Sequence, residues 1–317
     1  MKIVIFSNTE NGFEYEKEQF SKFGITPYIV CRKTEEGVIE AAQDAEIILF
    51  SDVALNANVI KNLKMCKLIV RYGIGCDNVD LKAAADAGIY VCNAPSYGVY
   101  DVAEHAMSLL LACSKRLGYL DGLVRNGIWD VEQMGKSRRL EGKTIGFLGF
   151  GKIARCVCAR TNAFGMKPIV YDPYIDPKCL EEYNAQSVGF DEVIEFSDYI
   201  TLHMPLSDST KHIIGKSQFE KMKNDAVIIN TSRGALIDEM ALIDALESGQ
   251  ISGAGLDVFE NESNKIDKRI LNMKNVVLTP HVAWNTFEAV VALHREVTDN
   301  VTRFLRGEIP ENIVNKF

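Results

Sequence analysis

Short apolar runs alternate with amphipathic segments along the chain, which is the pattern of an α/β protein. Between Met1 and Asn93, segments that can form helices, such as 12–23 and 80–87, separate β-type runs at 2–6, 27–30, 46–50, 67–70 and 90–92. Strands that alternate with helices form a parallel sheet covered by helices. The pattern therefore predicts a parallel α/β domain at the start of the chain.

The same alternation resumes near Thr144 and predicts a second parallel sheet that ends near Thr279. Its β-type runs occupy 144–148, 168–171, 199–202, 226–230, 254–256 and 276–278. Between them we predict a helix over 217–222 with a capping box of Ser217 and Glu220, and a helix over 238–246 that ends before Gly249.

Two amphipathic helices flank this second region. Asp101 and Glu104 can form a capping box at the start of the first, whose apolar positions are Val102, Ala106, Leu109, Cys113 and Leu117. The polar stretch 126–141 separates this helix from the second sheet. The other helix has one apolar face, and the pattern does not say which domain covers it; that face consists of Val290, Leu293, Val297, Val301 and Phe304.

The segment from Thr144 to Asp172 has the order strand, glycine turn, helix, strand. Gly149 and Gly151 follow the first strand, and Ala154 takes the third small position. In a dinucleotide-binding unit the first glycine permits the turn, the second lets the backbone approach the pyrophosphate, and the third small residue lets helix and strand pack closely. The helix N-terminus supplies free N–H groups and the positive end of a dipole. The segment thus predicts a dinucleotide site.

Asp172 ends the second strand of this unit, about 20 residues beyond the glycines. At that distance a carboxylate meets the ribose hydroxyls of the adenosine, and because it repels a 2′-phosphate we expect NAD rather than NADP. Two glycines in a loop more often only make a turn. Here the strand, the helix and the acid all agree with the dinucleotide interpretation.

The composition is that of an ordinary globular protein with more than one core. Its 317 residues exceed what one compact core normally organises, and 47% of them are hydrophobic and 25% charged. The formal net charge of -8 argues against a nucleic-acid surface, because phosphate contacts need clustered Lys and Arg and only 136–139 is a short basic run.

The sequence further predicts a cytoplasmic protein without a metal site. No apolar stretch approaches the ~18 residues of a membrane span, and the N-terminus lacks the features of a signal peptide. Most of the eight cysteines lie in apolar runs, as buried reduced thiols do. Cys156 and Cys158 are the only close pair, and on a helix they point to different sides, so we expect no shared metal.

Polar residues follow three strands in the second half: Arg233 in 230–234, Glu262 in 257–262 and His281 in 279–281. In an open α/β sheet ligands bind at the carboxyl ends of the strands, so these loops are expected to face the same crevice as the glycine loop. Taken singly, each residue also has a purely structural interpretation. Arg233 could be a surface cation, Glu262 a solvated acid, and His281 a histidine that hydrogen-bonds a backbone group. Together, behind a nucleotide loop, they favour chemistry.

An arginine, a glutamate and a histidine suit the reduction of a 2-oxo acid. A guanidinium donates two parallel hydrogen bonds to a carboxylate, and an imidazolium protonates a carbonyl oxygen near neutral pH. A carboxylate on the other ring nitrogen fixes the tautomer and favours the protonated form. His105 and His294 lie in helical patterns, His212 lies in a polar segment, and His203 at a strand end is expected to border the cofactor.

The sequence resembles the D-isomer-specific 2-hydroxyacid dehydrogenases nearly from end to end. This family includes phosphoglycerate, glycerate and D-lactate dehydrogenases, hydroxypyruvate reductases and the C-terminal-binding-protein corepressors. The shared motifs, in the family's order, are RYGIGCDNVDLKAAADAGIYVCNAP, DVAEHAMSLLLA, LEGKTIGFLGFGKIA, YDPY, LHMPL, INTSRGALID, GAGLDVFENE and LTPHVAW. The resemblance implies an NAD-dependent oxidoreductase that passes a hydride between nicotinamide and C2 of a small 2-hydroxy or 2-oxo acid.

The resemblance also implies roles for single residues. His281 would be the acid/base, Glu262 its partner and Arg233 the arginine that binds the substrate carboxylate. The substrate-binding residues would be Arg71, Ile74, Gly75 and Tyr97, with the N–H groups of Ile74 and Gly75 offered to the carboxylate. The cofactor-binding residues would be Gly149, Gly151, Lys152 and Ile153 at the pyrophosphate, Asp172 at the ribose, His203 and Pro205 at the adenine side, and Thr231, Asp257 and Ala283 at the nicotinamide end.

The implied fold has two Rossmann-like α/β domains. A flavodoxin-like substrate domain, made of 1–98 and 285–317, would carry an inserted doubly wound NAD-binding domain, 99–284, which contributes most of a homodimer interface. The sequence departs from the family at Ser263, where proline is usual, and in the shorter segment that leads to His281. It ends at Phe317, so we expect no regulatory domain of the kind that longer phosphoglycerate dehydrogenases have.

Two other functions stay open at this point. A redox-sensing corepressor would use NAD(H) on the same fold to set its assembly, and Trp284 is shared with that branch, although the intact catalytic set favours an enzyme. The other alternative is a phosphite- or formate-type oxidation, but Glu262 counts against the formate branch, which uses glutamine there. As to the substrate, Arg71 could meet a phosphate or support its own turn, and Tyr97 points towards the D-lactate type.

Overall fold

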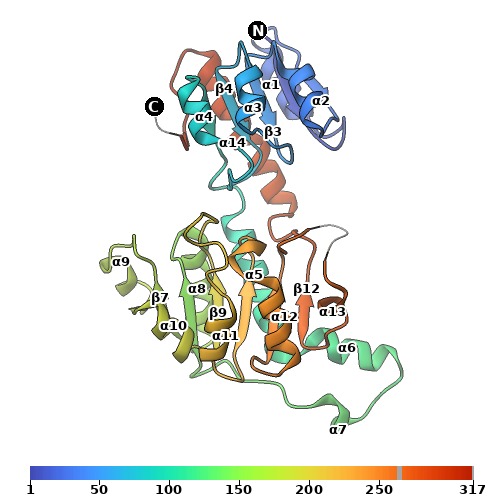
Figure 1. The fold of residues 1–317 in the computed structure, drawn as a ribbon, viewed down its shortest axis with the longest axis vertical. Helices are drawn as coiled ribbons and strands as arrows, with labels where there is room; N and C mark the ends of the chain where they lie inside the picture. Colours follow the sequence, from blue (N-terminus) through green and yellow to red (C-terminus); the bar gives the residue numbers. More distant parts are fainter. Residues whose placement is uncertain (263–265, 316–317) are drawn as a thin grey trace. The chain divides into compact units, whose positions relative to one another are not determined.

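The described part of the chain forms two compact units, each built on its own parallel sheet. The computed structural model describes residues 1–262 and 266–315. One unit comprises Met1–Gly98 and Asn285–Phe317, and the other comprises Val99–Trp284 (Figure 1). Ser263, where the sequence departs from the family pattern, and Phe317 lie outside the described residues.

The first unit contains a five-stranded parallel sheet with the strand order β2-β1-β3-β4-β5. Its strands are β1 (Ile3–Phe6), β2 (Tyr28–Val30), β3 (Ile47–Phe50), β4 (Leu68–Arg71) and β5 (Tyr90–Cys92). β1 and β3 are buried along their whole length, as apolar runs in the middle of a parallel sheet should be. The order is that of flavodoxin-like sheets, which confirms the predicted topology.

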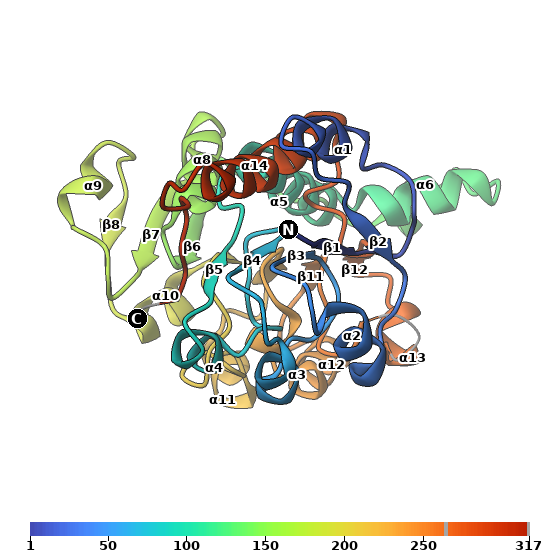
Figure 2. The same ribbon diagram turned by 90° about the horizontal axis from the view of Figure 1, so that it is seen from above.

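Helices cover both faces of this sheet. Figure 2 shows α1 (Glu14–Ser21) and α14 (Phe287–Leu305) on one face, and α2 (Glu35–Ala42), α3 (Ala57–Asn62) and α4 (Leu81–Asp86) on the other. Side chains cap the starts of four of these helices by accepting a backbone N–H; they are Thr34, Asn56, Asp80 and Thr286.

The first unit covers the apolar face of α14. Leu293, Val297 and Val301 are buried, and the helix packs against α1 and β4. The hydrophobic pattern predicted this helix but left its position open. Its packing joins a segment near the end of the chain to strands near the beginning.

The second unit is a seven-stranded parallel sheet with the strand order β12-β11-β10-β9-β6-β7-β8. The strands are β6 (Thr144–Leu148), β7 (Lys167–Tyr171), β8 (Gln186–Ser187), β9 (Tyr199–Leu202), β10 (Val227–Asn230), β11 (Gly253–Leu256) and β12 (Val276–Leu278). From β6 the chain winds outwards in one direction, and from β9 it winds in the other. This reversal beside β6 is the switch point of a doubly wound sheet, as predicted.

Cores form on both faces of this sheet because successive side chains of a strand point to opposite sides. Ile200 and Ile228 belong to one core, and Tyr199 and Ile229 belong to the other. The helices of this unit are α5 (Val99–Lys115), α6 (Leu117–Arg125), α7 (Val131–Met134), α8 (Lys152–Ala163), α9 (Lys178–Glu181), α10 (Phe190–Phe196), α11 (Lys216–Lys221), α12 (Glu239–Glu247) and α13 (Lys268–Leu271).

The ends of α5 differ from the prediction. The helix begins at Val99, so Asp101 and Glu104 lie within it and do not form the expected capping box. Arg116 has a left-handed backbone (φ +56°), which breaks the helical hydrogen bonding after Lys115. Leu117 therefore begins α6 and is 54% exposed, although its spacing placed it on the buried face of α5.

The predicted capping box of Ser217 and Glu220 is also wrong. α11 begins at Lys216, one residue earlier, and the Gly215 N–H donates to Oε1 of Gln218 over 3.1 Å. The Ser217 hydroxyl donates to the same Gln218 oxygen rather than capping the helix. The amide of Gln218 thus takes the place that the sequence pattern gave to Glu220.

The cysteines are free thiols, and burial makes several of them unreactive. None of the eight is in a disulfide. Burial raises the pKa of the thiols of Cys66, Cys92, Cys113 and Cys158 to about 12, so they stay protonated. Within residues 1–262 and 266–315, no group of three or more His, Cys, Asp or Glu side chains could hold a metal ion, and no helix is long and apolar enough to cross a membrane.

Candidate active site

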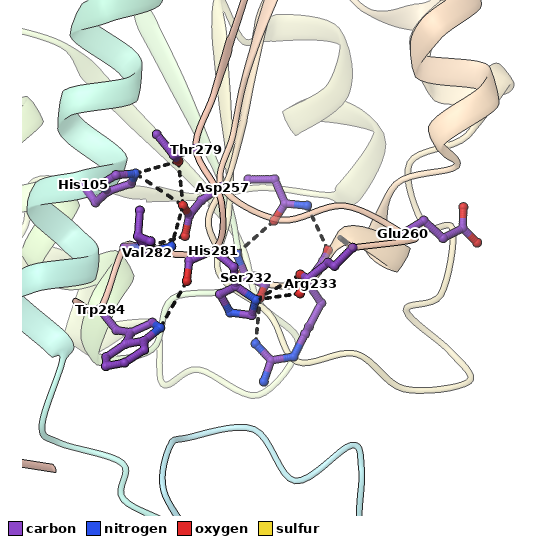
Figure 3. Close-up of polar contacts among 12 residues, drawn as sticks. His105, Ser232, Arg233, Asp257, Glu260, Thr279, His281, Val282 and Trp284 are labelled. Carbon is purple, nitrogen blue, oxygen red and sulfur yellow. Dashed lines mark hydrogen bonds and ion pairs between the residues drawn. The ribbon is translucent and has the colours of Figure 1, made fainter. Parts of the chain in front are cut away.

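Three residues predicted to be catalytic lie beyond the carboxyl ends of adjacent strands in the second unit. Arg233 follows β10, Glu262 follows β11 and His281 follows β12. The three strands are neighbours in the sheet. Figure 3 shows Arg233 and His281 close together at this edge. In a parallel sheet this is also the edge at which the glycine loop follows β6.

His281 and Glu262 form an ion pair at this edge. The Nδ1 atom of His281 lies 3.0 Å from Oε1 and 3.1 Å from Oε2 of Glu262. A hydrogen bond from Nδ1 fixes the ring orientation and leaves Nε2 for other partners, and Nε2 has none among the described residues. Because the side chains are 40% and 45% exposed, water screens the attraction, and the pair acts mainly by orienting the ring.

The backbone of His281 is held by Asp257, which is fully buried at the end of β11. The His281 N–H donates to the Asp257 main-chain carbonyl over 2.7 Å. The Asp257 carboxylate accepts the N–H of Val282 at 3.0 Å and of Ala283 at 2.9 Å (Figure 3). His281 has φ +56°, an uncommon conformation for a residue with a Cβ. Asp257 therefore stabilises the turn that presents the imidazole.

Two further side chains complete the environment of this aspartate. The Thr279 hydroxyl donates to Oδ1 of Asp257 over 2.6 Å, and Nε2 of His105 lies 2.9 Å from the same hydroxyl and 3.5 Å from Oδ1. His105 extends from α5, so the aspartate joins β11, β12 and α5 (Figure 3). Sequence reasoning treated His105 as a helical residue only. The LTPH motif did contain Thr279, but nothing in the sequence pairs it with His105.

A buried asparagine shapes the turn that carries Arg233. Asn230 is fully buried, accepts the N–H of Ser232 at 3.0 Å and donates to the carbonyl of Arg233 at 2.9 Å. The Ser232 hydroxyl donates to the carbonyl of Leu202 over 2.7 Å, which joins the turn to β9. Arg233 is partly buried, and its Nη1 donates to the Ser232 carbonyl over 2.8 Å. The guanidinium is thus held close to its own turn.

The segments that carry Arg233 and Glu262 are in close backbone contact. A Cβ on Gly234 would lie 1.9 Å from the carbonyl carbon of Phe259, so only glycine fits there. The Glu260 N–H donates to Oε2 of Glu239 over 3.0 Å, and the Glu260 carboxylate lies 2.8 Å from Nε2 of His212. Burial raises the pKa of Glu239. These contacts fix the segment that ends at Glu262.

The glycine loop has the geometry that the sequence pattern predicted. Gly149 has φ +86°, and a Cβ there would lie 2.7 Å from the carbonyl oxygen of His203. Gly151 precedes α8, has open space where a Cβ would be, and is followed by Lys152 and Ile153 in the first turn. No side chain caps this helix start. The start of a helix can bind an anion through its backbone N–H groups and the positive end of its dipole.

Asp172 at the end of β7 fixes this loop from the side. Its Oδ2 accepts the N–H of Phe150 over 2.8 Å, and its Oδ1 accepts the N–H of Tyr174 over 2.9 Å. Phe150 lies between the two glycines, so the carboxylate predicted to meet the ribose also supports the glycine loop. The sequence pattern did not indicate this second role.

The remaining predicted cofactor residues lie around the same edge. The ring of His203 stacks on Phe147 with ring centroids 6.1 Å apart, and its Nε2 lies 2.8 Å from the Thr201 hydroxyl. Burial lowers the pKa of His203 to about 3, so the ring is neutral near pH 7. Pro205 is exposed, and Ala283 is buried where its N–H meets Asp257.

The predicted substrate residues belong to the first unit. Arg71 ends β4, and its guanidinium lies over Gly73, where a Cβ would meet Nη1 at 1.9 Å. Gly73 has φ +139°, which favours glycine. The Ile74 carbonyl accepts a hydrogen bond of 2.7 Å from Asn93, which holds the loop of Ile74 and Gly75 to the residues after β5. Tyr97 follows on that same stretch and is partly buried.

Comparison with known proteins decides the family. The model of the NAD-binding domain of D-isomer specific 2-hydroxyacid dehydrogenases matches residues 107–283, more than half of the chain. The chain belongs to the D-isomer specific 2-hydroxyacid dehydrogenases. The predictions of this family, of an NAD-binding Rossmann domain and of an oxidoreductase are confirmed.

Relatives of this dehydrogenase extend over nearly its whole length. It is 40% identical over 279 residues to the glyoxylate reductase of Thermococcus litoralis, which covers 86% of this chain and 84% of that protein. It is 41% identical over 284 residues to the D-3-phosphoglycerate dehydrogenase of Methanocaldococcus jannaschii, with 89% of this chain but 54% of that protein covered. The chain thus spans about half the length of that second relative.

A solved structure of the family has the same fold. The D-lactate dehydrogenase from Aquifex aeolicus, complexed with NAD and lactic acid, superimposes with a TM-score of 0.92 at 28% identity, and each chain is covered completely. In the dehydrogenase described here, Thr231 Oγ1 is buried and has no hydrogen-bond partner within the described residues. Together with the open space at Gly151 and the uncapped start of α8, this orphaned hydroxyl fits a bound NAD.

Proposed function

We propose that this dehydrogenase interconverts a small 2-oxo acid and the corresponding D-2-hydroxy acid with NAD as the hydride carrier. The observation that carries the proposal is the His281–Glu262 pair, held by Asp257 at the strand ends beside Arg233. An oriented imidazole, a guanidinium and a dinucleotide loop at one edge of a sheet are the groups that this reaction needs. Family membership supports the same conclusion.

The acid/base step belongs to His281. When bound, NADH supplies a hydride to C2 of the oxo acid. The imidazolium of His281 donates its Nε2 proton to the carbonyl oxygen, while Nδ1–H remains hydrogen-bonded to Glu262. In the reverse direction the neutral Nε2 accepts the hydroxyl proton. Glu262 keeps the ring in one tautomer in both directions, so the proton always moves through Nε2.

Arg233 binds the substrate carboxylate, and its positive charge draws electron density towards the guanidinium. Its planar guanidinium donates two parallel hydrogen bonds to a carboxylate, which orients C2. In the first unit, Arg71 and Tyr97 would border the substrate, and the N–H groups of Ile74 and Gly75 would complete the carboxylate site. The turn at Gly73, with φ +139°, supports this role, because successive backbone N–H groups in a turn can form a concavity that binds an anion.

The cofactor residues follow from the loop after β6. Gly149, Gly151, Lys152 and Ile153 would hold the pyrophosphate, and Asp172 the ribose. His203 and Pro205 would border the adenine, while Thr231, Asp257 and Ala283 would contact the nicotinamide end. The carboxylate of Asp172 supports NAD over NADP because a second phosphate there would meet a like charge.

We further propose a homodimer formed through the second unit. Large apolar side chains are exposed along and after α6: Leu117, Val124, Trp129 and Val131. A group of this kind on one segment is typical of a protein interface. Light scattering coupled to size exclusion tests the assembly. The cytoplasmic location stays a prediction.

The activity is tested by following NADH oxidation with pyruvate, hydroxypyruvate, glyoxylate, 2-oxoisocaproate, phenylpyruvate and 3-phosphohydroxypyruvate. We expect turnover of at least one oxo acid, a D product on chiral analysis and a preference for NADH over NADPH. The preferred side chain at C3 then identifies the substrate. Tight NADH binding without turnover of any oxo acid would instead favour the nucleotide-sensing alternative.

A further inference from the structure

A buried carboxylate lies beside the predicted substrate loop in the first unit. Glu16 on α1 is fully buried. Its Oε1 accepts a hydrogen bond of 2.8 Å from the Tyr72 hydroxyl and lies 2.5 Å from Nδ1 of His294 on α14. Tyr72 is the residue between Arg71 and Gly73. One carboxylate oxygen therefore connects two helices to the loop after β4.

Aromatic rings enclose this cluster. Phe13 packs edge-on against Tyr72, with ring centroids 6.0 Å apart, and against His294 at 5.8 Å. The rings of Tyr72 and His294 are 5.4 Å apart. Burial and the nearby Glu16 carboxylate raise the pKa of Tyr72 well above its ordinary value, so its hydroxyl remains a donor. The side chain of Tyr72 is thus fixed by hydrogen bonding and by packing together.

Stability alone does not account for the cluster. Oε2 of Glu16 is buried and has no hydrogen-bond partner within the described residues. A buried carboxylate with an unpaired oxygen destabilises a fold, and apolar side chains at such positions are often neutral or better. Buried polar groups of this kind can instead impose one geometry on the segments that they join. Here that segment leads directly into Gly73, Ile74 and Gly75.

The same helix also holds the second predicted substrate segment. Glu296, two residues beyond His294 on α14, accepts the N–H of Ser96 over 3.2 Å. Ser96 directly precedes Tyr97. Asn93, at the start of this stretch, donates to the Ile74 carbonyl over 2.7 Å. α14 is thereby connected to both loops through separate side chains.

We propose that Glu16 and His294 are positioning residues that set the geometry of the loop 71–75 for the substrate carboxylate. The inference rests on the proposed function. Tyr72 transmits the effect, because its fixed side chain determines where the backbone turns at Gly73 and where the N–H groups of Ile74 and Gly75 point. The cofactor residues and His281 belong to the other unit. The cluster should therefore affect binding of the oxo acid and leave hydride transfer and NADH binding unchanged.

The experiment compares Tyr72→Phe, Glu16→Leu and Glu16→Gln with the wild type, using the oxo acid that the wild type reduces fastest. Tyr72→Phe and Glu16→Leu should raise KM about tenfold. This is the size of effect expected when one hydrogen bond to a charged group is lost. The values of kcat and of the NADH dissociation constant should stay within about twofold. Glu16→Gln retains an oxygen that accepts from Tyr72 and His294, so its KM should remain near that of the wild type.

Asn56→Ala is the matched control. It removes the N-cap of α3 in the same unit, where Asn56 accepts the Val59 N–H over 3.0 Å. It should lower the urea midpoint without changing KM. If Glu16→Leu does not fold, Tyr72→Phe, which loses a single hydroxyl, decides the question.

Wild-type KM in folded Tyr72→Phe would overturn the inference. An equal rise in KM for Asn56→Ala, or losses that fall on kcat and NADH binding, would also overturn it. None of these results would affect the proposed function. If the wild type itself reduces no oxo acid, the proposed function fails and this inference fails with it.

Discussion

Asp257 holds His281 by its main chain: the His281 N–H donates to the Asp257 carbonyl over 2.7 Å, and the Asp257 carboxylate accepts the next two backbone N–H groups. The imidazole is therefore presented from a left-handed turn that one buried side chain stabilises. In the proposed mechanism, the residue that moves the proton, His281, is therefore distinct from the residue that positions it, Asp257.

Asp257→Asn should lower kcat strongly and lower the stability of the fold only slightly. The side-chain amide of asparagine has one acceptor oxygen, whereas the carboxylate has two. One set of donors therefore loses its acceptor: either the Thr279 hydroxyl together with the Val282 N–H, or the Ala283 N–H. A displaced imidazole can lower kcat roughly a hundredfold. The matched control is Asp198→Asn. Asp198 is also buried, and its carboxylate accepts the N–H of Thr144, the first residue of β6, over 2.8 Å. Steady-state kinetics that show equal losses for both variants would contradict the role of Asp257.

Gly149→Ala and Gly151→Ala should separate folding from cofactor binding. A Cβ on Gly149 would collide with the His203 carbonyl at 2.7 Å, so this variant should lose both thermal stability and NADH binding. A Cβ on Gly151 has open space, so this variant should keep its Tm and still bind NADH at least tenfold more weakly, because the methyl group occupies the approach of the pyrophosphate. Fluorescence titration and thermal melts measure both. Undiminished NADH binding by Gly151→Ala would count against the pyrophosphate assignment.

The sequence predicted the strands more accurately than it predicted the ends of the helices. The runs 46–50 and 144–148 became β3 and β6 within one residue, because a parallel sheet buries both faces and only continuous apolar runs fit. The start of α5 and the cap of α11 were wrong. Several residues can cap a helix, and tertiary contacts decide which one does.

The positions of the candidate site residues were predictable from the sequence, but the contacts that hold these residues were not. The strand-end positions of Arg233, Glu262 and His281 follow from the sheet rule, and the sequence motifs identified them. The contacts of Glu16 with Tyr72 and His294 join residues far apart in the chain, as do those of His105 with Asp257. Periodicity describes one segment at a time, so it cannot pair side chains from different segments.

Gly234→Ala should disable catalysis through the backbone. Its Cβ would lie 1.9 Å from the carbonyl carbon of Phe259, so the segments carrying Arg233 and Glu262 must separate. We expect kcat/KM to fall roughly a hundredfold. In Gly215→Ala the nearest atoms lie at an ordinary 3.7 Å, so this control should behave as the wild type. Similar kcat/KM values for the two variants would show that the Gly234 contact does not matter.

His203 should make the fold less stable in acid. Its pKa is lowered to about 3 by burial, whereas an unfolded histidine titrates near 6.5. Between these values the unfolded chain binds a proton that the folded chain does not, so stability falls as the pH decreases from about 6.5. Urea midpoints at pH 7 and pH 5 should therefore differ less for His203→Gln than for the wild type. An unchanged difference would mean that the ring is not buried in its neutral form.

The most direct test of the account is the rate of NADH oxidation by His281→Asn with the best oxo acid of the wild type. Asparagine tolerates the left-handed backbone of this position, so the fold and NADH binding should remain. The control His212→Asn changes a histidine with the same backbone handedness, which pairs with Glu260 instead of Glu262. The account predicts that kcat falls by a factor of about 100 to 10,000 for His281→Asn, and severalfold at most for His212→Asn. If His281→Asn keeps kcat within about tenfold of the wild type, His281 is not the acid/base.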